Sequence, residues 1–585
     1  MANQIEWVAL SVFVFFFALV TVMGFFAARW KSGPVSAHLD QWGLGGRQFG
    51  IWVTWFLVGG DFYTAYTVIA VPALVYAVGA YGFFALPYTI IVYPFVFAVM
   101  PLLWKQAHAN GHVTAADVVH GTYHSRGLEL AVAITGMVAT MPYIALQLIG
   151  MSVTIKTMGL KGDLPIIAAF IILALYTYSS GLRAPALIAF VKDIMIYIVV
   201  LVAIVVVPAK LGGYGVVFAA ANDAFATKGG LTGLTLKPSQ MLPYASLALG
   251  SALAAFMYPH TLTGIFASKS ADTIRKNAIL LPAYTLLLGL IALLGYMAYA
   301  AKIAVPTPND VVPALFQALF PSWFAGFAFS AIAIGALVPA AVMSIGAANL
   351  FTRNVWKSYV NPAISHAGEA AVAKITSLVV KLGALAFILF LPTQYALDLQ
   401  LLGGLWILQT FPALVFGLFT RWFRAEGLLL GWAAGIIWGS WTAWSNGLKP
   451  LASIELGGAS YMFYVGLGAL ILNVVVADQI GSRPRRLCQS QSGQDQLCQL
   501  IGLVPAGDRI VQAEDRRADA GHPLQGRQRF GDGGGFGSGD RDHCRRRPGI
   551  GSDQEWIGAR ARGRGAETDG GFPGRSDHEG GRHRH

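Results

Sequence analysis

Long apolar segments fill the chain from residue 5 to residue 477, and short polar connections separate them. Each segment is close to the roughly 20 residues that a helix needs to cross the ~30 Å hydrocarbon core of a bilayer. The pattern predicts an all-α polytopic membrane protein with about thirteen transmembrane helices. The predicted spans are residues 5–28, 51–78, 81–104, 128–151, 164–180, 185–208, 239–258, 278–300, 323–350, 377–393, 400–420, 427–445 and 459–477.

The second span contains a helix-breaking signal at mid-depth, where Gly59 and Gly60 precede Asp61. The bilayer core offers no water to free peptide groups or to an ionised carboxylate. An interrupted helix is tolerated there mainly where its backbone lines a cavity that binds something polar. This combination indicates solute transport.

Composition excludes a soluble protein, since 55% of the residues are hydrophobic, 12% are charged and the mean hydropathy is +0.58. The first span follows no cationic residue and precedes no small-residue cleavage site, so we expect it to be retained. The spans contain no HExxH, no GxSxG and no Cys-His pair, which argues against an enzyme. A channel is disfavoured because no ring of charges and no repeated filter sequence occurs.

Lysine and arginine accumulate in cytoplasmic loops, so their distribution predicts the orientation. With the N-terminus outside, the inner loops contain fourteen cationic residues and the outer loops contain seven, all of them lysine. An odd number of spans then places the C-terminus in the cytoplasm. We therefore expect a multi-pass protein of the plasma (bacterial inner) membrane. The net charge of +12 reflects this topology and requires no nucleic-acid partner, although anionic lipid is a favourable neighbour.

The chain divides into a transporter domain, 1–479, and a tail, 480–585, that is rich in arginine and glycine. Eighteen arginines, no lysine and few aliphatic residues cannot build a core. Translation of a GC-rich gene in a shifted reading frame is the preferred explanation, because such codons produce arginine and glycine. A basic disordered tail that touches lipid or a partner, and a folded regulatory domain, are the alternatives. All three cysteines lie here, with a spacing that matches no paired metal motif.

Several strings of the sequence resemble the sodium:solute symporter family, and within it the bacterial monocarboxylate permeases that take up pyruvate, lactate and alanine. The resemblance covers about residues 5–477. It rests on Gly59-Gly60-Asp61-Phe62-Tyr63, Gly181-Leu182-Arg183-Ala184 with Lys192-Asp193, Tyr258-Pro259-His260, Ala267-Ser268-Lys269, GALVPAAVMSIGAANLFTRN over residues 335–354, and Leu408-Gln409-Thr410-Phe411-Pro412-Ala413.

The resemblance implies a LeuT-type fold with two five-helix inverted repeats, spans two to six and seven to eleven, and a substrate site near mid-membrane. It also implies a secondary active transporter that imports small monocarboxylates by cation-coupled symport. The sequence specifies no cofactor beyond the coupling ion, H⁺ or Na⁺, and no oligomeric state. Alternatives are a Na⁺-coupled symporter of another small organic solute and a transporter-like nutrient sensor.

The break in the second span supplies the first candidate residues for substrate binding or ion coupling. Asp61 either couples the ion to the substrate or caps the freed amides of the broken helix. Tyr63, Thr64 and Tyr66 add hydroxyl groups just beyond it, with packing against neighbouring helices as the alternative. The backbone of Gly59 and Gly60 completes this set.

Further candidates are polar residues in other spans. Lys192 and Asp193 are adjacent, so they should point about 100° apart on a helix and form no face-to-face pair. For Asp193 we favour a structural or gating role over substrate contact. His260 either carries a proton or meets the substrate, or is a structural residue at a helix end. Gln147 and Gln409 either contact the substrate or bond a neighbouring helix.

The sequence departs from the family at the sodium site. Family members supply two adjacent hydroxyl residues from the ninth span, and an ungapped alignment puts Val338 and Pro339 there. A hard cation needs several oxygen ligands, and only backbone carbonyls near Gly59, Phe62 and Gly335 would remain. We therefore expect coupling to H⁺ in preference to Na⁺.

Overall fold

The apolar spans fold as helices, as the sequence predicts. The computed structural model describes residues 5–29, 38–60, 64, 66–160, 162–390 and 396–481. The continuous spans are α1 (Trp7–Phe26), α5 (Ala85–Ala109), α7 (Arg126–Thr157), α8 (Leu164–Ser180), α9 (Arg183–Leu211), α14 (Pro282–Ala300), α16 (Ser322–Leu350), α17 (His366–Phe390), α20 (Ala425–Ser445) and α21 (Val465–Gly481). In the described residues six helices are long and apolar enough to cross a membrane alone, and two bent pairs raise the number to eight. The remaining predicted spans form shorter or less apolar helices.

The second span is broken, as its glycines predict. It consists of α3 (Ile51–Thr54), the π-helix η2 (Trp55–Gly59), the π-helix η4 (Tyr66–Ala70) and α4 (Val71–Val78). The predicted site residues Asp61, Phe62 and Tyr63 lie outside the described residues.

The seventh span is also broken, which the sequence analysis did not predict. Its helix α11 (Pro238–Ala255) is followed by α12 (Pro259–Phe266), and the two helices are bent by 46°. The span therefore extends past its predicted end at residue 258. The physical reason is proline, whose ring fixes φ and carries no N–H, so Pro259 starts a new helix.

The eleventh span bends by 43° between Gln400–Leu408 and Pro412–Phe419. Its elements are α18 (Ala396–Leu408), the π-helix η9 (Pro412–Phe416) and α19 (Gly417–Phe419). Pro412 has the same role here as Pro259 in the seventh span.

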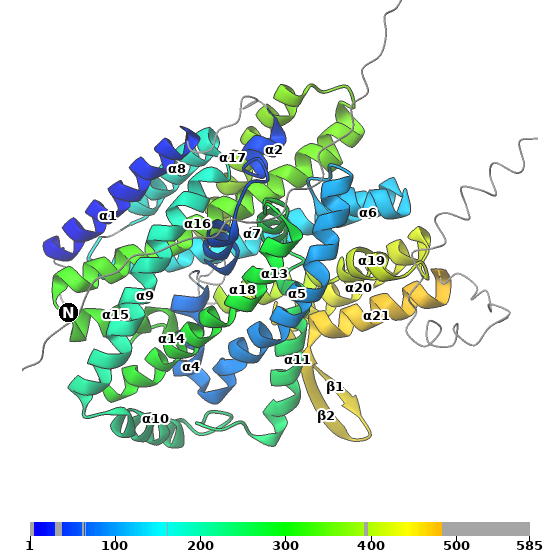
Figure 1. The fold of residues 1–585 in the computed structure, drawn as a ribbon. Helices are drawn as coiled ribbons and strands as arrows, with labels where there is room; N and C mark the ends of the chain where they lie inside the picture. The colour runs from blue at the N-terminus through cyan, green and yellow to red at the C-terminus, as the bar shows by residue number, and fades with distance from the viewer. Residues whose placement is uncertain are drawn as a thin grey trace, which may run out of the picture. The chain divides into compact units, whose positions relative to one another are not determined.

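The thirteenth span begins later than predicted. Residues 459–464 form the strand β2 (Ala459–Tyr464), which pairs antiparallel with β1 (Leu451–Leu456), and α21 starts only at Val465. A β-hairpin is compatible with alternating small, polar and aromatic residues, which a hydropathy window cannot distinguish from the start of a helix. In Figure 1 the hairpin projects beside α11, and α20 lies along α21.

Short helices connect the spans and cover the ends of the bundle. They are η1 (Ala27–Arg29), α2 (Leu39–Gly43), η5 (Ala80–Phe84), α6 (Ala115–Tyr123), α10 (Tyr214–Lys228), α13 (Ala271–Leu280), η6 (Pro308–Asp310), α15 (Val311–Leu319) and the π-helix η7 (Phe351–Val360).

The core of the bundle is centred on α16, whose most apolar window is fully buried. This helix packs against α1, α7, α9, α12 and α17 (Figure 1). Small residues such as Gly335, Gly346 and many alanines line it, and small residues let helix backbones approach closely in a membrane. A shift of α16 would therefore affect every element that packs on it.

Candidate functional site

A buried ion pair lies against the break in the second span. Lys192 and Asp193 of α9 are both fully buried, and 3.0 Å separates Lys192 Nζ from Asp193 Oδ1. The Lys192 ammonium also donates a hydrogen bond to the carbonyl oxygen of Gly60, where the helix ends. Tyr284 of α14 donates to Asp193 Oδ2 at 2.7 Å. A buried charge pair is tolerated when further hydrogen bonds satisfy both partners, and these contacts meet that requirement.

This arrangement corrects the expectation that adjacent residues on α9 form no pair. The Cα–Cβ bonds of neighbours do diverge, but the lysine side chain has four rotatable methylenes and can fold back toward the carboxylate. Burial removes the alternative of reaching water. A low-dielectric surrounding then makes pairing the only favourable arrangement for both charges.

The two glycines of the break leave room for this pair. A Cβ atom on Gly60 would lie 2.7 Å from Asp193 Oδ2 and 2.9 Å from Lys192 Nζ. A Cβ atom on Gly59 would lie 2.4 Å from the Tyr284 ring. Only glycine permits such close approach, so the ion pair and Tyr284 can pack against the break only because both positions are glycine.

A cavity borders the break in the seventh span on one side. The space in it that the centre of a water molecule can occupy is about 30 Å³. The rings of Tyr143 and Tyr258 lie 5.4 Å and 5.2 Å from the imidazole of His260, and Tyr258 donates a hydrogen bond to the Gln400 carbonyl. The cavity thus combines aromatic walls with hydroxyl, imidazole and amide groups, as small-molecule sites commonly do. Its lining residues are Tyr88, Tyr143, Ser251, Ala255, Tyr258, His260, Thr261 and Gln400.

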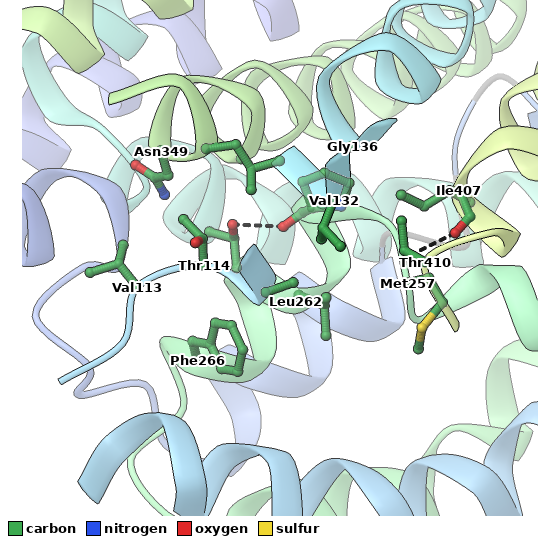
Figure 2. A pocket seen from close by; sticks show the side chains of 15 residues that line it. Val113, Thr114, Val132, Gly136, Met257, Leu262, Phe266, Asn349, Ile407 and Thr410 are labelled. Atoms are coloured by element: carbon green, nitrogen blue, oxygen red, sulfur yellow. Dashed lines mark hydrogen bonds between the residues drawn. The ribbon is translucent and has the colours of Figure 1, made fainter. Parts of the chain in front are cut away.

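A second cavity, shown in Figure 2, borders the same break on its other side. Met257 and Pro259 belong to its wall, whereas Tyr258 and His260 belong to the wall of the first cavity. The second cavity runs toward Val113 in the connection between α5 and α6. The break therefore separates two spaces, which we call the His260 cavity and the Val113 cavity.

A polar network lies beside the Val113 cavity at the end of the bundle that holds Arg353. Thr114, which lines the cavity, donates to Asn354 Oδ1 at 2.7 Å. Asn354 Nδ2 in turn donates to Asp117 at 2.7 Å and to Glu129 at 2.8 Å. Arg353 forms ion pairs with Asp117 at 3.6 Å and with Glu369 at 3.2 Å. These contacts join α6, α7, η7 and α17 beside the cavity.

A histidine lies beside this network, outside the spans. Burial lowers the pKa of His112, and the charges of Arg353, Arg47 and His120 lower it as well, while Asp117 opposes them. Burial and the neighbouring cations thus favour the neutral form of the His112 imidazole.

The remaining predicted site residues are distributed as follows. Thr64 and Tyr66 are buried at the second-span break, where the Thr64 hydroxyl accepts from the Tyr66 amide at 3.0 Å. Gln147 is buried on α7, one turn from Tyr143, to whose carbonyl it donates at 3.3 Å. Gln409 is buried next to Thr410, which lines the Val113 cavity, and Asn473 of α21 donates to its main-chain carbonyl at 2.9 Å and to its side-chain oxygen at 3.2 Å.

The structure brings Gly60 and Asp193 together, and it separates this pair from the cavity that contains His260. Gly335, Val338 and Pro339 are buried in α16, and α9 packs against both α16 and η2. Helix α9, which contains Lys192, thus lies next to both the second-span break and α16.

Sequence analysis missed Lys192 as a partner of the break, and it missed Tyr284, Tyr143 and Tyr258. A lysine next to an aspartate inside an apolar span was a usable signal for Lys192. The tyrosines gave none, because aromatic residues are common throughout these spans.

A bundle of apolar helices with interrupted spans beside buried charge and cavities is typical of secondary transporters. The model of the sodium:solute symporter family matches residues 42–435, and the chain belongs to this family. Family and fold are those of transporters and not of enzymes.

Three relatives are informative. The "Monocarboxylate transport permease protein" of Rhizobium johnstonii (strain DSM 114642 / LMG 32736 / 3841) is 70% identical over 477 residues, which is 82% of this chain and 97% of that protein. The uncharacterized symporter YodF of Bacillus subtilis (strain 168) is 34% identical over 71% of this chain and 84% of its own. The structure of a Na⁺-coupled sialic acid symporter in a substrate-bound outward-open state has a TM-score of 0.67 at 15% identity, covering 81% of this chain and 98% of that one. The last likeness concerns the fold, which is the LeuT type predicted from the sequence.

Proposed function

We propose that this protein imports small monocarboxylates, pyruvate and lactate first, with alanine and acetate as further candidates, and that protons drive the import without sodium. The name of the 70% identical relative supports the substrate class. The family supports symport of a small solute.

One observation carries the proposed coupling ion, namely the Lys192 ammonium bonded to the Gly60 carbonyl. A cation at a helix break is held by free carbonyl oxygens, and here a tethered cation already holds that oxygen. Asp193 supplies the counter-charge. The ninth span offers Val338 and Pro339, which have no side-chain oxygen, where family members have hydroxyl groups. A sodium ion would therefore have to displace Lys192 and would still find too few ligands.

The His260 cavity is the proposed substrate site. A three-carbon acid has a carboxylate and one further polar group, and the lining offers hydroxyl groups from Tyr143 and Ser251 and the imidazole of His260. Apolar ring faces suit the methyl group. Its lining contains no lysine and no arginine, so binding would rest on hydrogen bonds and on an incoming proton.

The proposed setting is the bacterial inner membrane, with the Arg353 end of the bundle in the cytoplasm and the N-terminus outside. The excess of arginine and lysine in the loops of that end supports this orientation. The Val113 cavity is then the inner half of the transport path, and anionic lipid is a favourable neighbour of the basic loops.

Uptake into proteoliposomes tests the proposal. Labelled pyruvate, lactate, alanine and acetate are offered under an inward H⁺ gradient, under an inward Na⁺ gradient at fixed pH, or with choline and no gradient. We expect accumulation with H⁺ and no gain from Na⁺. Accumulation that depends strictly on Na⁺ would identify a sodium symporter instead, and absence of any uptake by folded protein would favour a sensor.

A further inference from the structure

A second lysine is buried in the bundle, on α17. Lys381 is 1% exposed and lies 15 residues after the start of this 25-residue helix. Its Nζ donates a hydrogen bond to Ser377 Oγ at 2.7 Å. Ser377 Oγ lies 3.1 Å from Ser344 Oγ on α16, and Ser344 donates to the Ala341 carbonyl at 2.7 Å. A chain of two hydroxyl groups thus links the amine to the central helix.

Lys381 differs from Lys192 in its partners. Lys192 has a carboxylate at 3.0 Å, whereas within the described part of the chain no carboxylate lies within 4.0 Å of Lys381 Nζ. Burying an ammonium without a counter-charge costs several kcal/mol, so no carboxylate of the described residues holds Lys381 permanently in its charged form. Ser377 is a neutral partner that serves either form, because a hydroxyl group can accept from an ammonium and donate to an amine.

Other ionisable groups near Lys381 are remote or already paired. On α17 itself Lys374 is about 10 Å away along the axis and stacks on Tyr178, and Glu369 is about 18 Å away and pairs with Arg353 and Lys357. The elements packed on α17 are α2, α7, α8, α16 and η7. Their ionisable side chains are Asp40, Arg126, Glu129, Tyr143, Lys156, Tyr176, Tyr178, Arg353, Lys357 and Tyr359, and α16 has none.

We propose that Lys381 is a proton-binding group of the transport cycle, with Ser377 and Ser344 as its hydroxyl partners. The inference rests on the proposed proton-coupled function and assigns the proton to a residue. The neutral amine accepts a proton from the outer water onto its lone pair, and the ammonium later releases the same proton to the inner water. No other bond forms or breaks.

The position of α16 explains how protonation of Lys381 affects the substrate site. Gly346 follows Ser344 by two residues, and a Cβ atom on it would lie 2.9 Å from the main-chain nitrogen of His260 at the seventh-span break. Such contact without an intervening side chain transmits small shifts, since packed helices move as rigid units. A change of charge at Lys381 that rearranges the hydrogen bonds of Ser377 and Ser344 therefore shifts the wall between the two cavities.

Two substitutions test the inference in proteoliposomes. A gradient of about one pH unit can sustain about tenfold accumulation at one proton per substrate. Lys381→Met fixes the neutral state and Lys381→Arg fixes the charged state. We expect both variants to lose accumulation, to a ratio of about one, and we expect Lys381→Met to retain counterflow exchange with a pH profile that has become flat. Lys374→Met, two turns away on the same helix, is the control and should accumulate substrate like the wild type.

Accumulation at the wild-type ratio by folded Lys381→Met would overturn the inference and leave proton coupling intact. Failure of the wild type itself to accumulate under an H⁺ gradient would overturn the proposed function and this inference with it. If the lysine variants do not fold, Ser377→Ala decides, because removal of the hydroxyl partner should shift the pH midpoint of exchange. An unchanged midpoint in folded Ser377→Ala would contradict the role of Lys381.

Discussion

The buried pair at the second-span break makes a quantitative prediction. Asp193→Asn removes at nearly constant volume the carboxylate charge that lies 3.0 Å from the buried Lys192 ammonium, and it leaves the hydrogen bond to the Gly60 carbonyl in place. Removing one partner of a buried pair typically costs about 3–5 kcal/mol, because the other charge remains uncompensated. Lys192→Met should cost a similar amount, since the Asp193 carboxylate would keep only the Tyr284 hydroxyl at 2.7 Å.

The double variant separates this explanation from simple packing defects. With both charges gone no uncompensated ion remains, and replacing a whole buried pair is often nearly neutral. We therefore expect the destabilisation of Lys192→Met/Asp193→Asn to be about 3 kcal/mol smaller than the sum of the destabilisations of the two single variants. Tyr284→Phe removes one hydrogen bond to a charged group and should cost about 1.5–3 kcal/mol.

The assay is denaturant unfolding of the purified proteins in one detergent, at one pH, in choline buffer. Each variant is compared with the wild type at matched protein concentration, and reversibility is checked first. Single-variant costs that add within about 0.5 kcal/mol would show that the two charges do not interact, and would remove the main support for a tethered cation at the break.

Four further predictions follow from other features. Gly60→Ala should abolish uptake because its Cβ would lie 2.7 Å from the buried carboxylate, while Gly50→Ala, which meets nothing within 4 Å, should leave uptake unchanged. Burial lowers the pKa of His112 below the ordinary 6.5, so the stability that this residue contributes is full above pH 6.5 and falls as the pH drops below that value. Thermal unfolding should therefore show that His112→Gln loses less stability than the wild type between pH 7 and about 5. Asp61→Asn should stop uphill accumulation in the uptake assay and spare counterflow, and wild-type accumulation would reduce Asp61 to a cap. Truncation after Gly481 should preserve insertion and uptake, and loss of folded protein would identify the tail as a domain.

The number and type of elements could be predicted from the sequence because the bilayer imposes a length on every span. Hydropathy sufficed for α1 or α16, where about 20 apolar residues leave one option. It failed at β2, because six residues of mixed polarity next to a span read equally well as its first turns. It also missed the bend at Pro259, since a proline near a predicted helix end looks like a terminus and not like a joint.

The candidate site was less predictable for a different reason. Single residues with unusual cost in a membrane, such as Asp193, can be identified from the sequence. Partners from other spans cannot, because tertiary packing alone brings Tyr284 or Gly60 to that carboxylate. Lys381 escaped notice although the same energetic argument applies to it, and the structure reveals that its partners are serines and not an acid.

The joint in the seventh span connects these sites. Gly136 of α7 and Gly346 of α16 approach Pro259 from two sides, with Cβ positions 3.0 Å from the proline ring and 2.9 Å from its carbonyl carbon. No side chain can be inserted there, so the joint cannot move unless α7 or α16 moves with it. Helix α16 also packs against α9, which carries Lys192, and against α17, which carries Lys381. If Lys381 binds the proton as we propose, its change of charge acts on the same helix that holds the wall between the His260 cavity and the Val113 cavity, and we expect proton binding and substrate release to be steps of one movement.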